Sequence, residues 1–244
     1  LTSTNSSIGL IYALKKIFNN MFIFLKKLKY ILVLLKNALL DKEKARELII
    51  NSTYLKFYIF KHKLLTADYE YPQETDFNIS LEKANQNQPA PLLILHRNIV
   101  FCKKNNFFDD TFSFIDIGSG SGLLIHYISN NLDYFQSYYG IEFEKNFFEI
   151  SKKNLISFVH KDINLLYKDA RNFLLEDKKY LIYLYNPFKF DILKIFMQNN
   201  YENIVKNKSI IIYHNDIHIE ELKKNFEFRY LQTFPGTSII LSKN

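Results

Sequence analysis

Apolar residues recur every three or four positions near the start of the chain, which predicts one face of a long helix. The stripe consists of Leu14, Ile17, Met21, Phe24, Leu28, Ile31, Leu35 and Ala38. Lysines project mainly from the opposite half, so we expect an amphipathic basic helix. Its uncharged segments, 17–25 and 30–35, are well short of the roughly 20 residues that span a bilayer, so we do not expect it to cross a membrane.

Beyond this stripe the pattern changes twice before residue 92. A charged helix at 41–47 leads into an aromatic stretch at 54–60, and we interpret both as packing elements. Residues 66–91 are polar, contain Pro72, Pro89 and Pro91, and have few periodic apolar positions, which indicates an irregular connector. The predicted organisation is a basic amphipathic helical arm at 1–65, a connector at 66–91 and a folded domain at 92–244.

The domain at 92–244 alternates short apolar runs with segments of helical spacing. After a helix at 92–104, the runs typical of buried parallel strands are 112–117, 137–142, 163–167, 180–185 and 209–213. Helical spacing occurs at 121–131, 145–154 and 191–205, and a turn between 226–232 and 237–241 predicts a final hairpin. We therefore predict an α/β fold: a doubly wound, Rossmann-like, seven-stranded and mostly parallel sheet with one antiparallel strand, preceded by the helical arm.

Positive charge is concentrated in the arm. The formal net charge is +7, but residues 1–65 hold twelve Lys or Arg against three Asp or Glu, a net of +9, which leaves −2 for the rest. The total therefore does not indicate a nucleic-acid substrate. For residues 10–40 two interpretations stay open: packing on the body or self-association, and peripheral contact with an anionic membrane surface. We do not expect nucleic acid as a partner, because this helix carries Lys without Arg.

Cysteine and histidine usage argues against disulfides and metals. Cys102 is the single cysteine, which excludes an intramolecular disulfide and a cysteine-based metal cluster. His214 and His218 have no clear third ligand, so we expect no metal site. No small-residue cleavage site follows the first apolar residues, and we expect a cytoplasmic protein, at the inner membrane face if the arm binds lipid.

A cluster of glycines directly follows the predicted strand at 112–117. Half of the six glycines in the chain lie within five residues, at Gly118, Gly120 and Gly122. Glycine permits positive φ and close approach to a ligand, so a strand, this turn and a helix predict a nucleotide cradle. Leu123 stands where the dinucleotide fingerprint needs glycine, and Asp116 would repel a pyrophosphate. Asp116 suits a cationic or neutral ligand, and Glu142, at the end of the next strand, can accept both hydroxyls of a ribose.

With these residues, the sequence resembles the class I S-adenosylmethionine-dependent methyltransferases over about residues 86–220. The stretch 116–122 looks like the family's first motif. This implies that the methionine end of the cofactor is held by Asp116, Gly118, Ser119, Gly120 and Gly122. Residues 140–143 look like the second motif, which implies Glu142 on the ribose and Phe143 beside the adenine. Residues 168–170 resemble the acidic loop after the third strand, which implies Asp169 and Ala170 at the adenine.

The fourth resembling stretch is Leu184-Tyr185-Asn186-Pro187-Phe188, in the place of the family motif that faces the transferred methyl. The chain is also similar to a group of small bacterial methyltransferases that carry a Tyr-Gln-Pro-like segment, here Asn87-Gln88-Pro89, before the first motif. This similarity implies a cofactor contact for Gln88. Methyltransferases that act on bases or glutamine usually have two prolines after the Asn, and here there is one, which puts a DNA-adenine or glutamine acceptor in doubt.

The resemblance implies methyl transfer from S-adenosylmethionine to a small molecule, a saccharide or a protein side chain. Such a displacement needs mainly positioning, and a base only for a hydroxyl or ammonium acceptor. The candidates for acceptor contact and catalysis are Tyr185, Asn186 and His214, with Asn186 also close to the cofactor. Two alternatives stay open: aminopropyl transfer from decarboxylated S-adenosylmethionine, and a non-catalytic membrane-associated or assembly subunit that retains the cofactor fold.

Overall fold

The computed structural model describes residues 42–66, 91–185, 187–234 and 236–243. Contacts between residues divide the chain into two compact units, Leu1–Ile50 and Asn51–Asn244. Of the first unit, only residues 42–50 are described, and they form the first turns of helix α2 (Lys42–His62). The predicted stripe at 10–40 and most of the predicted connector lie outside the described residues.

The second unit begins inside α2, earlier than the domain start predicted from composition. Leu55 and Tyr58 are buried in the same hydrophobic core as helix α3 (Leu92–Lys104). The side chain of Asn51 accepts a hydrogen bond from the backbone N–H of Leu93 at 3.2 Å. Residues 51–62 therefore pack as part of the domain, because one face of this aromatic helix supplies core side chains.

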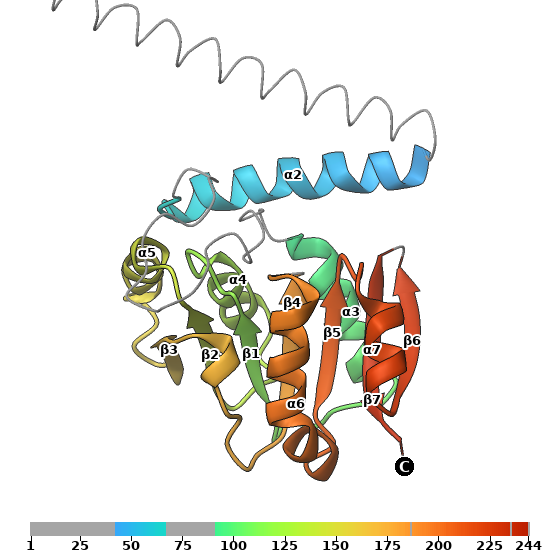
Figure 1. The fold of residues 1–244 in the computed structure, drawn as a ribbon. Helices are drawn as coiled ribbons and strands as arrows, with labels where there is room; N and C mark the ends of the chain where they lie inside the picture. Colours follow the sequence, from blue (N-terminus) through green and yellow to red (C-terminus); the bar gives the residue numbers. More distant parts are fainter. Residues whose placement is uncertain (1–41, 67–90, 186, 235, 244) are drawn as a thin grey trace, which may run out of the picture. The chain divides into compact units, whose positions relative to one another are not determined.

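The sheet contains seven strands in the order β3-β2-β1-β4-β5-β7-β6 (Figure 1). In chain order the strands are β1 (Ser113–Ile117), β2 (Tyr138–Glu142), β3 (Ile163–Tyr167), β4 (Tyr180–Tyr185), β5 (Ile210–His214), β6 (Phe228–Phe234) and β7 (Thr237–Ser242). Strands β1 to β5 are parallel, whereas β7 pairs antiparallel with both β5 and β6. The mostly parallel sheet with one antiparallel strand is confirmed.

Helices cover both faces of the sheet, as expected for a doubly wound fold (Figure 1). They are α3, α4 (Leu123–Asn131), α5 (Lys145–Leu155), the short 3-10 helix η2 (Ala170–Asn172), α6 (Phe190–Lys206) and α7 (Ile219–Asn225). Side chains of α2, α3 and α4 share one core with one face of the sheet, and those of α6 and α7 share a second core with the other face. The sequence pattern did not indicate α7, which has seven residues and buries only Leu222.

The central strands are buried on both faces, which explains their continuous apolar runs. Phe114, Leu181 and Ile212 point into the core that contains α3 and α4. Ile115, Ile182 and Ile211 point into the core that contains α6. Because the five parallel strands end at one edge of the sheet, the polar residues at their carboxyl ends are brought together there.

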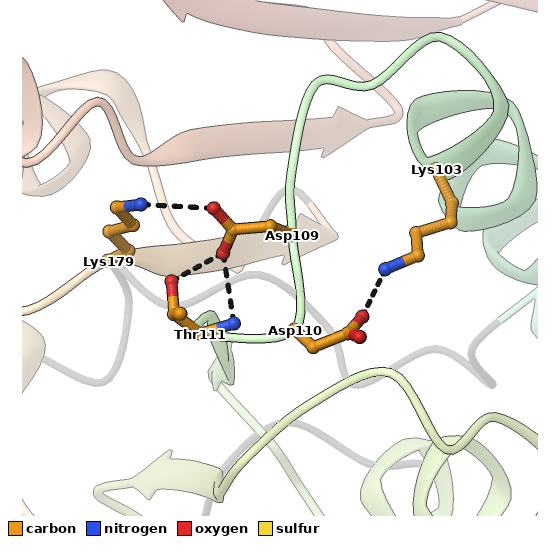
Figure 2. Close-up of polar contacts among 5 residues, drawn as sticks. All are labelled: Lys103, Asp109, Asp110, Thr111 and Lys179. Atoms are coloured by element: carbon orange, nitrogen blue, oxygen red, sulfur yellow. Dashed lines mark hydrogen bonds and ion pairs between the residues drawn. The ribbon is translucent and has the colours of Figure 1, made fainter.

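Surface ion pairs hold the loop between α3 and β1 at the opposite edge (Figure 2). Lys179, just before β4, donates to Asp109 at 3.1 Å, and Lys103 on α3 pairs with Asp110. Thr111 donates its backbone N–H to Asp109 at 2.9 Å, and its hydroxyl also donates. These bonds from Thr111 are the main reason why the pKa of Asp109 is lowered to about 2. The polar groups at this edge are thus engaged with one another.

Candidate functional site

The loop after β1 folds back over the end of β2. The backbone N–H groups of Gly118 and Ser119 both donate to the carbonyl oxygen of Ile141, each at 2.9 Å. The φ values are +82°, +53° and +73° at Gly118, Gly120 and Gly122. A Cβ added to Gly118 would lie 2.8 Å from the Cβ of Pro187. Positive φ and this close approach explain why the loop needs glycine.

Glu142 ends β2 directly beside this loop, and its carboxylate is buried. One oxygen accepts from the backbone N–H of Gly120 at 2.7 Å, and the other accepts from those of Phe143 and Glu144 at 2.9 and 2.8 Å. Burial raises the pKa of Glu142 to about 7, although the three N–H donors act in the opposite direction. The side chain thus joins the glycine loop to the end of β2.

Asp116 is the second buried acid of the site, in the interior of β1. Burial, and then the charge of Glu142, raise its pKa to about 8. Among the described residues, no hydrogen-bond donor and no cationic side chain offsets this rise. Two carboxyl groups with raised pKa values therefore lie on adjacent strands, an arrangement that a cationic ligand would stabilise.

An apolar hollow opens next to the glycine loop. Its lining consists of Gly118, Ile141, Phe143, Lys168, Asp169, Ala170, Arg171, Pro187, Phe188 and Ile192. These residues come from the loops after β1, β3 and β4, the end of β2 and the start of α6. The predicted residues Phe143, Asp169 and Ala170 are thus placed together. A flat, largely apolar ring system with a polar edge would suit such a lining.

Asp169 is already engaged by a neighbour that the sequence pattern did not indicate. Arg171 donates its backbone N–H to Asp169 at 2.9 Å, and its guanidinium bonds the other carboxylate oxygen through two nitrogens, each at 2.7 Å. Asp169 also begins the 3-10 helix η2. The carboxylate is therefore oriented beside the hollow, with Arg171 next to it.

Tyr185 and His214 lie at the carboxyl ends of the adjacent strands β4 and β5. They are paired in register, and their ring centroids are 4.9 Å apart. Burial lowers the pKa of His214 to about 4, so the imidazole is neutral at pH 7. Its Nδ1 lies 2.6 Å from the hydroxyl of Thr237 at the start of β7. The pair thus presents a neutral ring and a phenol at the edge where β4 and β5 end.

Asn154 is a further residue of the site that the sequence did not reveal. From α5, its side-chain amide donates to the carbonyl oxygen of Ser121 in the glycine loop at 2.8 Å. The same side chain pairs with both backbone groups of Leu65, at 2.8 and 3.0 Å. No local pattern marks it, because both partners are distant in sequence. Gln88 and Asn186, which sequence analysis assigned to the site, lie outside the described residues.

Comparisons with solved structures find similar folds among methyltransferases. A protein from Methanococcus maripaludis assigned to the S-adenosyl-L-methionine-dependent methyltransferases is 22% identical, with 62% of this chain and 84% of that chain covered and a TM-score of 0.46. An rRNA methylase from Streptococcus thermophilus is 12% identical, with 61% of this chain and 95% of that chain covered and a TM-score of 0.43. The human methyltransferase 10 domain containing protein is 13% identical, with 80% of this chain and 96% of that chain covered and a TM-score of 0.49. No family model and no curated protein matches the sequence.

The order of the strands, with β7 antiparallel beside β5, agrees with the fold that the sequence resemblance implies. The chain has a doubly wound, Rossmann-like α/β fold. The predicted site residues from Asp116 to His214 that the structure describes lie at or near the carboxyl edge of the sheet. The expectation that nucleic acid is not a partner gains no support from the described residues.

Two further properties of the described residues bear on partners. None of their helices is long and apolar enough to cross a membrane. They also contain no group of three or more His, Cys, Asp or Glu that could hold a metal ion. His214 ends β5 and His218 precedes α7, so their four-residue separation does not place them on one helical face.

The raised pKa of Asp116 predicts that the stability of the folded domain depends on pH. The folded protein keeps a proton that the unfolded chain loses near its ordinary pKa, so stability falls as pH rises from about 4 to about 8. Asp116→Asn removes this titration. Between pH 5 and pH 8 we expect the wild type to lose at least about 2 kcal/mol more stability than the variant, measured by urea denaturation.

The lowered pKa values of two histidines change stability with pH in the opposite direction. Their contribution is the same in the wild type and in the Asp116→Asn variant, so it cancels when the two are compared. Burial lowers the pKa values of His126 and His214 to about 4, so each favours the folded state as pH rises from about 4 towards 6.5. Both proteins carry these histidines. Parallel stability curves for the wild type and the Asp116→Asn variant would contradict the assignment to Asp116.

Proposed function

We propose that the chain is an S-adenosylmethionine-dependent methyltransferase. The observation that carries the proposal is the buried carboxylate of Glu142, which accepts from Gly120 at 2.7 Å at the carboxyl end of β2. Its sequence neighbours Ile141 and Phe143 line the apolar hollow. A carboxylate between a glycine loop and an apolar hollow offers acceptors for ribose hydroxyls and space for a base beside them.

The residues present fit this cofactor along its length. Asp116 and the loop at 118–122 would hold the methionine end, where a positively charged amino group meets a buried acid. Glu142 would accept the ribose hydroxyls. Phe143, Ala170 and Asp169 would contact the adenine, with Asp169 oriented by Arg171 to accept from its amino group. A dinucleotide fits less well, since its pyrophosphate would meet Asp116.

The protein's contribution to methyl transfer would be positioning. Bound S-adenosylmethionine supplies a methyl group on a sulfonium, which needs no acid to leave. Tyr185 and His214, with Asn186, would orient the acceptor at the carboxyl ends of β4 and β5. His214 is neutral at pH 7 and could take a proton from a hydroxyl acceptor, although its pKa of about 4 makes it a weak base.

For the acceptor we propose a small molecule, a saccharide or a protein side chain. Support comes from the single proline after Asn186, which departs from the pattern of enzymes that methylate bases. The partly buried Tyr185–His214 pair suits an acceptor that presents a hydroxyl or amine. For residues 10–40, self-association or peripheral membrane contact remains a proposal from the sequence alone.

Isothermal titration of the full chain with S-adenosylhomocysteine tests the function, and NAD is the matched control ligand. We expect one molecule of S-adenosylhomocysteine per chain and no binding of NAD. A folded protein that binds neither would overturn the proposal. Incubation with methyl-labelled S-adenosylmethionine and separate small-molecule, saccharide, protein and RNA fractions of a cell extract then identifies the acceptor class. Tight binding without transfer to any fraction would favour the non-catalytic subunit.

A further inference from the structure

Tyr183 carries a buried hydroxyl that lacks a hydrogen-bond partner among the described residues. The residue lies in β4, is 1% exposed and packs in the core that contains α3 and α4. A buried phenol usually finds a partner, because leaving its hydroxyl without one costs free energy that an apolar ring would not. An orphaned hydroxyl of this kind points to a partner that none of the described residues supplies in the ligand-free structure.

Asp116 is the ionisable residue of the neighbouring strand β1. The two residues are register partners in the parallel pair β1 and β4, so their side chains project from the same face of the sheet. Burial, then Tyr185, then the charge of Asp116 raise the pKa of Tyr183 well above its ordinary value. The phenol therefore stays protonated and keeps a hydrogen that it can donate to a carboxylate.

A second orphaned hydroxyl lies on the other side of Asp116. Gly140 on β2 is also a register partner of Asp116, and a Cβ at Gly140 would lie 2.9 Å from the hydroxyl oxygen of Ser119. This hydroxyl is buried and also has no partner among the described residues. Asp116 thus lies between two buried hydroxyls, one on the β4 side and one on the β2 side.

Resting on the proposed function, we propose that Tyr183 is a positioning residue: its hydroxyl donates to ionised Asp116, which receives the ammonium group at the amino-acid end of the cofactor. Ser119, in the glycine loop, provides the second hydroxyl beside Asp116. The ligand brings a positive charge that the described residues around Asp116 do not supply, and the hydroxyl of Tyr183 finds its partner as the carboxylate forms. Binding is then coupled to release of a proton from Asp116.

Other ionisable groups face the same region and must be separated from Asp116. Burial raises the pKa of Glu142 on β2 to about 7. Tyr185 on β4 and His214 on β5 lie on the same face, and α3 and α4 contribute His96 and His126, whose pKa values are lowered by burial. Of these groups, Glu142 would release a proton when it binds a ribose, with or without an amino-acid end on the ligand.

Two ligands separate the contribution that the amino-acid end of the cofactor makes to binding. S-adenosylhomocysteine carries it, whereas 5′-methylthioadenosine has the same base, ribose and sulfur but lacks it. Each is titrated into the full chain at pH 7 in buffers of different ionisation enthalpy, which gives affinity and proton release together. For the wild type we expect S-adenosylhomocysteine to release up to about one proton more than 5′-methylthioadenosine, because Asp116, with a pKa of about 8, is mostly protonated beforehand.

Tyr183→Phe removes only the hydroxyl. We expect its affinity for S-adenosylhomocysteine to fall about 10- to 100-fold, in line with the loss of a hydrogen bond to a charged group, and the extra proton release to shrink. Affinity for 5′-methylthioadenosine should stay within about twofold of the wild type. The melting temperature of the ligand-free variant should be unchanged or higher, since an orphaned hydroxyl is removed.

Tyr138→Phe is the matched control. Tyr138 is also fully buried in the same core, but its hydroxyl already donates to the carbonyl oxygen of Leu132 at 3.1 Å. We expect this variant to melt at a lower temperature and to keep the wild-type ratio of the two affinities. Equal S-adenosylhomocysteine affinity for the wild type and Tyr183→Phe, or an equal loss for both ligands, would overturn the role of Tyr183. A wild type that binds neither ligand would instead overturn the proposed function.

Discussion

Glu142→Gln is expected to weaken S-adenosylhomocysteine binding by about 100-fold or more. The carboxylate would accept two ribose hydroxyls, and each hydrogen bond to a charged group is worth about 1.5–3 kcal/mol. The amide keeps the size of the side chain but turns one terminal oxygen into an NH2 donor. That donor must face either Gly120 or the pair Phe143 and Glu144, all of which offer N–H groups. Calorimetric titration at pH 7.5 measures the loss.

Glu144→Gln is the control for this prediction. Glu144 is a buried acid two residues further on, and it caps helix α5 by accepting from the N–H groups of Asn146 and Phe147 at 3.3 and 2.8 Å. Its replacement should lower stability by about 0.5–2 kcal/mol, as for other helix caps, with affinity within about threefold of the wild type. If both variants bind equally well, Glu142 does not contact the ligand.

Gly118→Ala is expected to abolish measurable S-adenosylhomocysteine binding and to lower the melting temperature by several degrees. At φ +82° an alanine costs about 1–2 kcal/mol, and its Cβ would also lie 2.8 Å from the Cβ of Pro187. Pro187 is held within the backbone and cannot rotate away, so the loop must move. A displaced loop loses the two bonds to Ile141 that fix its path.

Gly236→Ala separates the effect of backbone strain from the effect of the clash with Pro187. Gly236 has a similar φ of +71°, but the nearest atom to an added Cβ is 4.0 Å away. Backbone strain should therefore lower the stability of this variant by about 1–2 kcal/mol without a clash. It should bind S-adenosylhomocysteine as the wild type does. Thermal melting and titration of both variants check the prediction. Wild-type affinity in Gly118→Ala would show that the loop is not part of the cofactor site.

Sequence patterns predicted the sheet well because its signals are local. Each strand is a short apolar run, and the end of a parallel strand places its last residue at a known edge. Asp116, Glu142 and His214 could therefore be brought to one edge from their positions alone. The three glycines were informative because the chain has so few, and their positive φ values supply the physical reason.

Features that depend on distant partners could not be predicted. Nothing near α2 in the sequence shows that residues 51–62 belong to the domain, because their partners lie on α3 and α4. The contact of Arg171 with Asp169 could not be predicted, because a single basic residue soon after an acid is common on protein surfaces. Tyr183 was one tyrosine among 17, and only its register with Asp116 and its orphaned hydroxyl distinguish it.

Asn154 gives the domain a mechanical link between its N-terminal segment and the glycine loop. One amide bonds both backbone groups of Leu65 and also the carbonyl oxygen of Ser121. A pull on the chain just after α2 would therefore reach the glycine loop through a single side chain. A displacement of Leu65 would therefore be transmitted through Asn154 to the loop that we assign to the methyl donor.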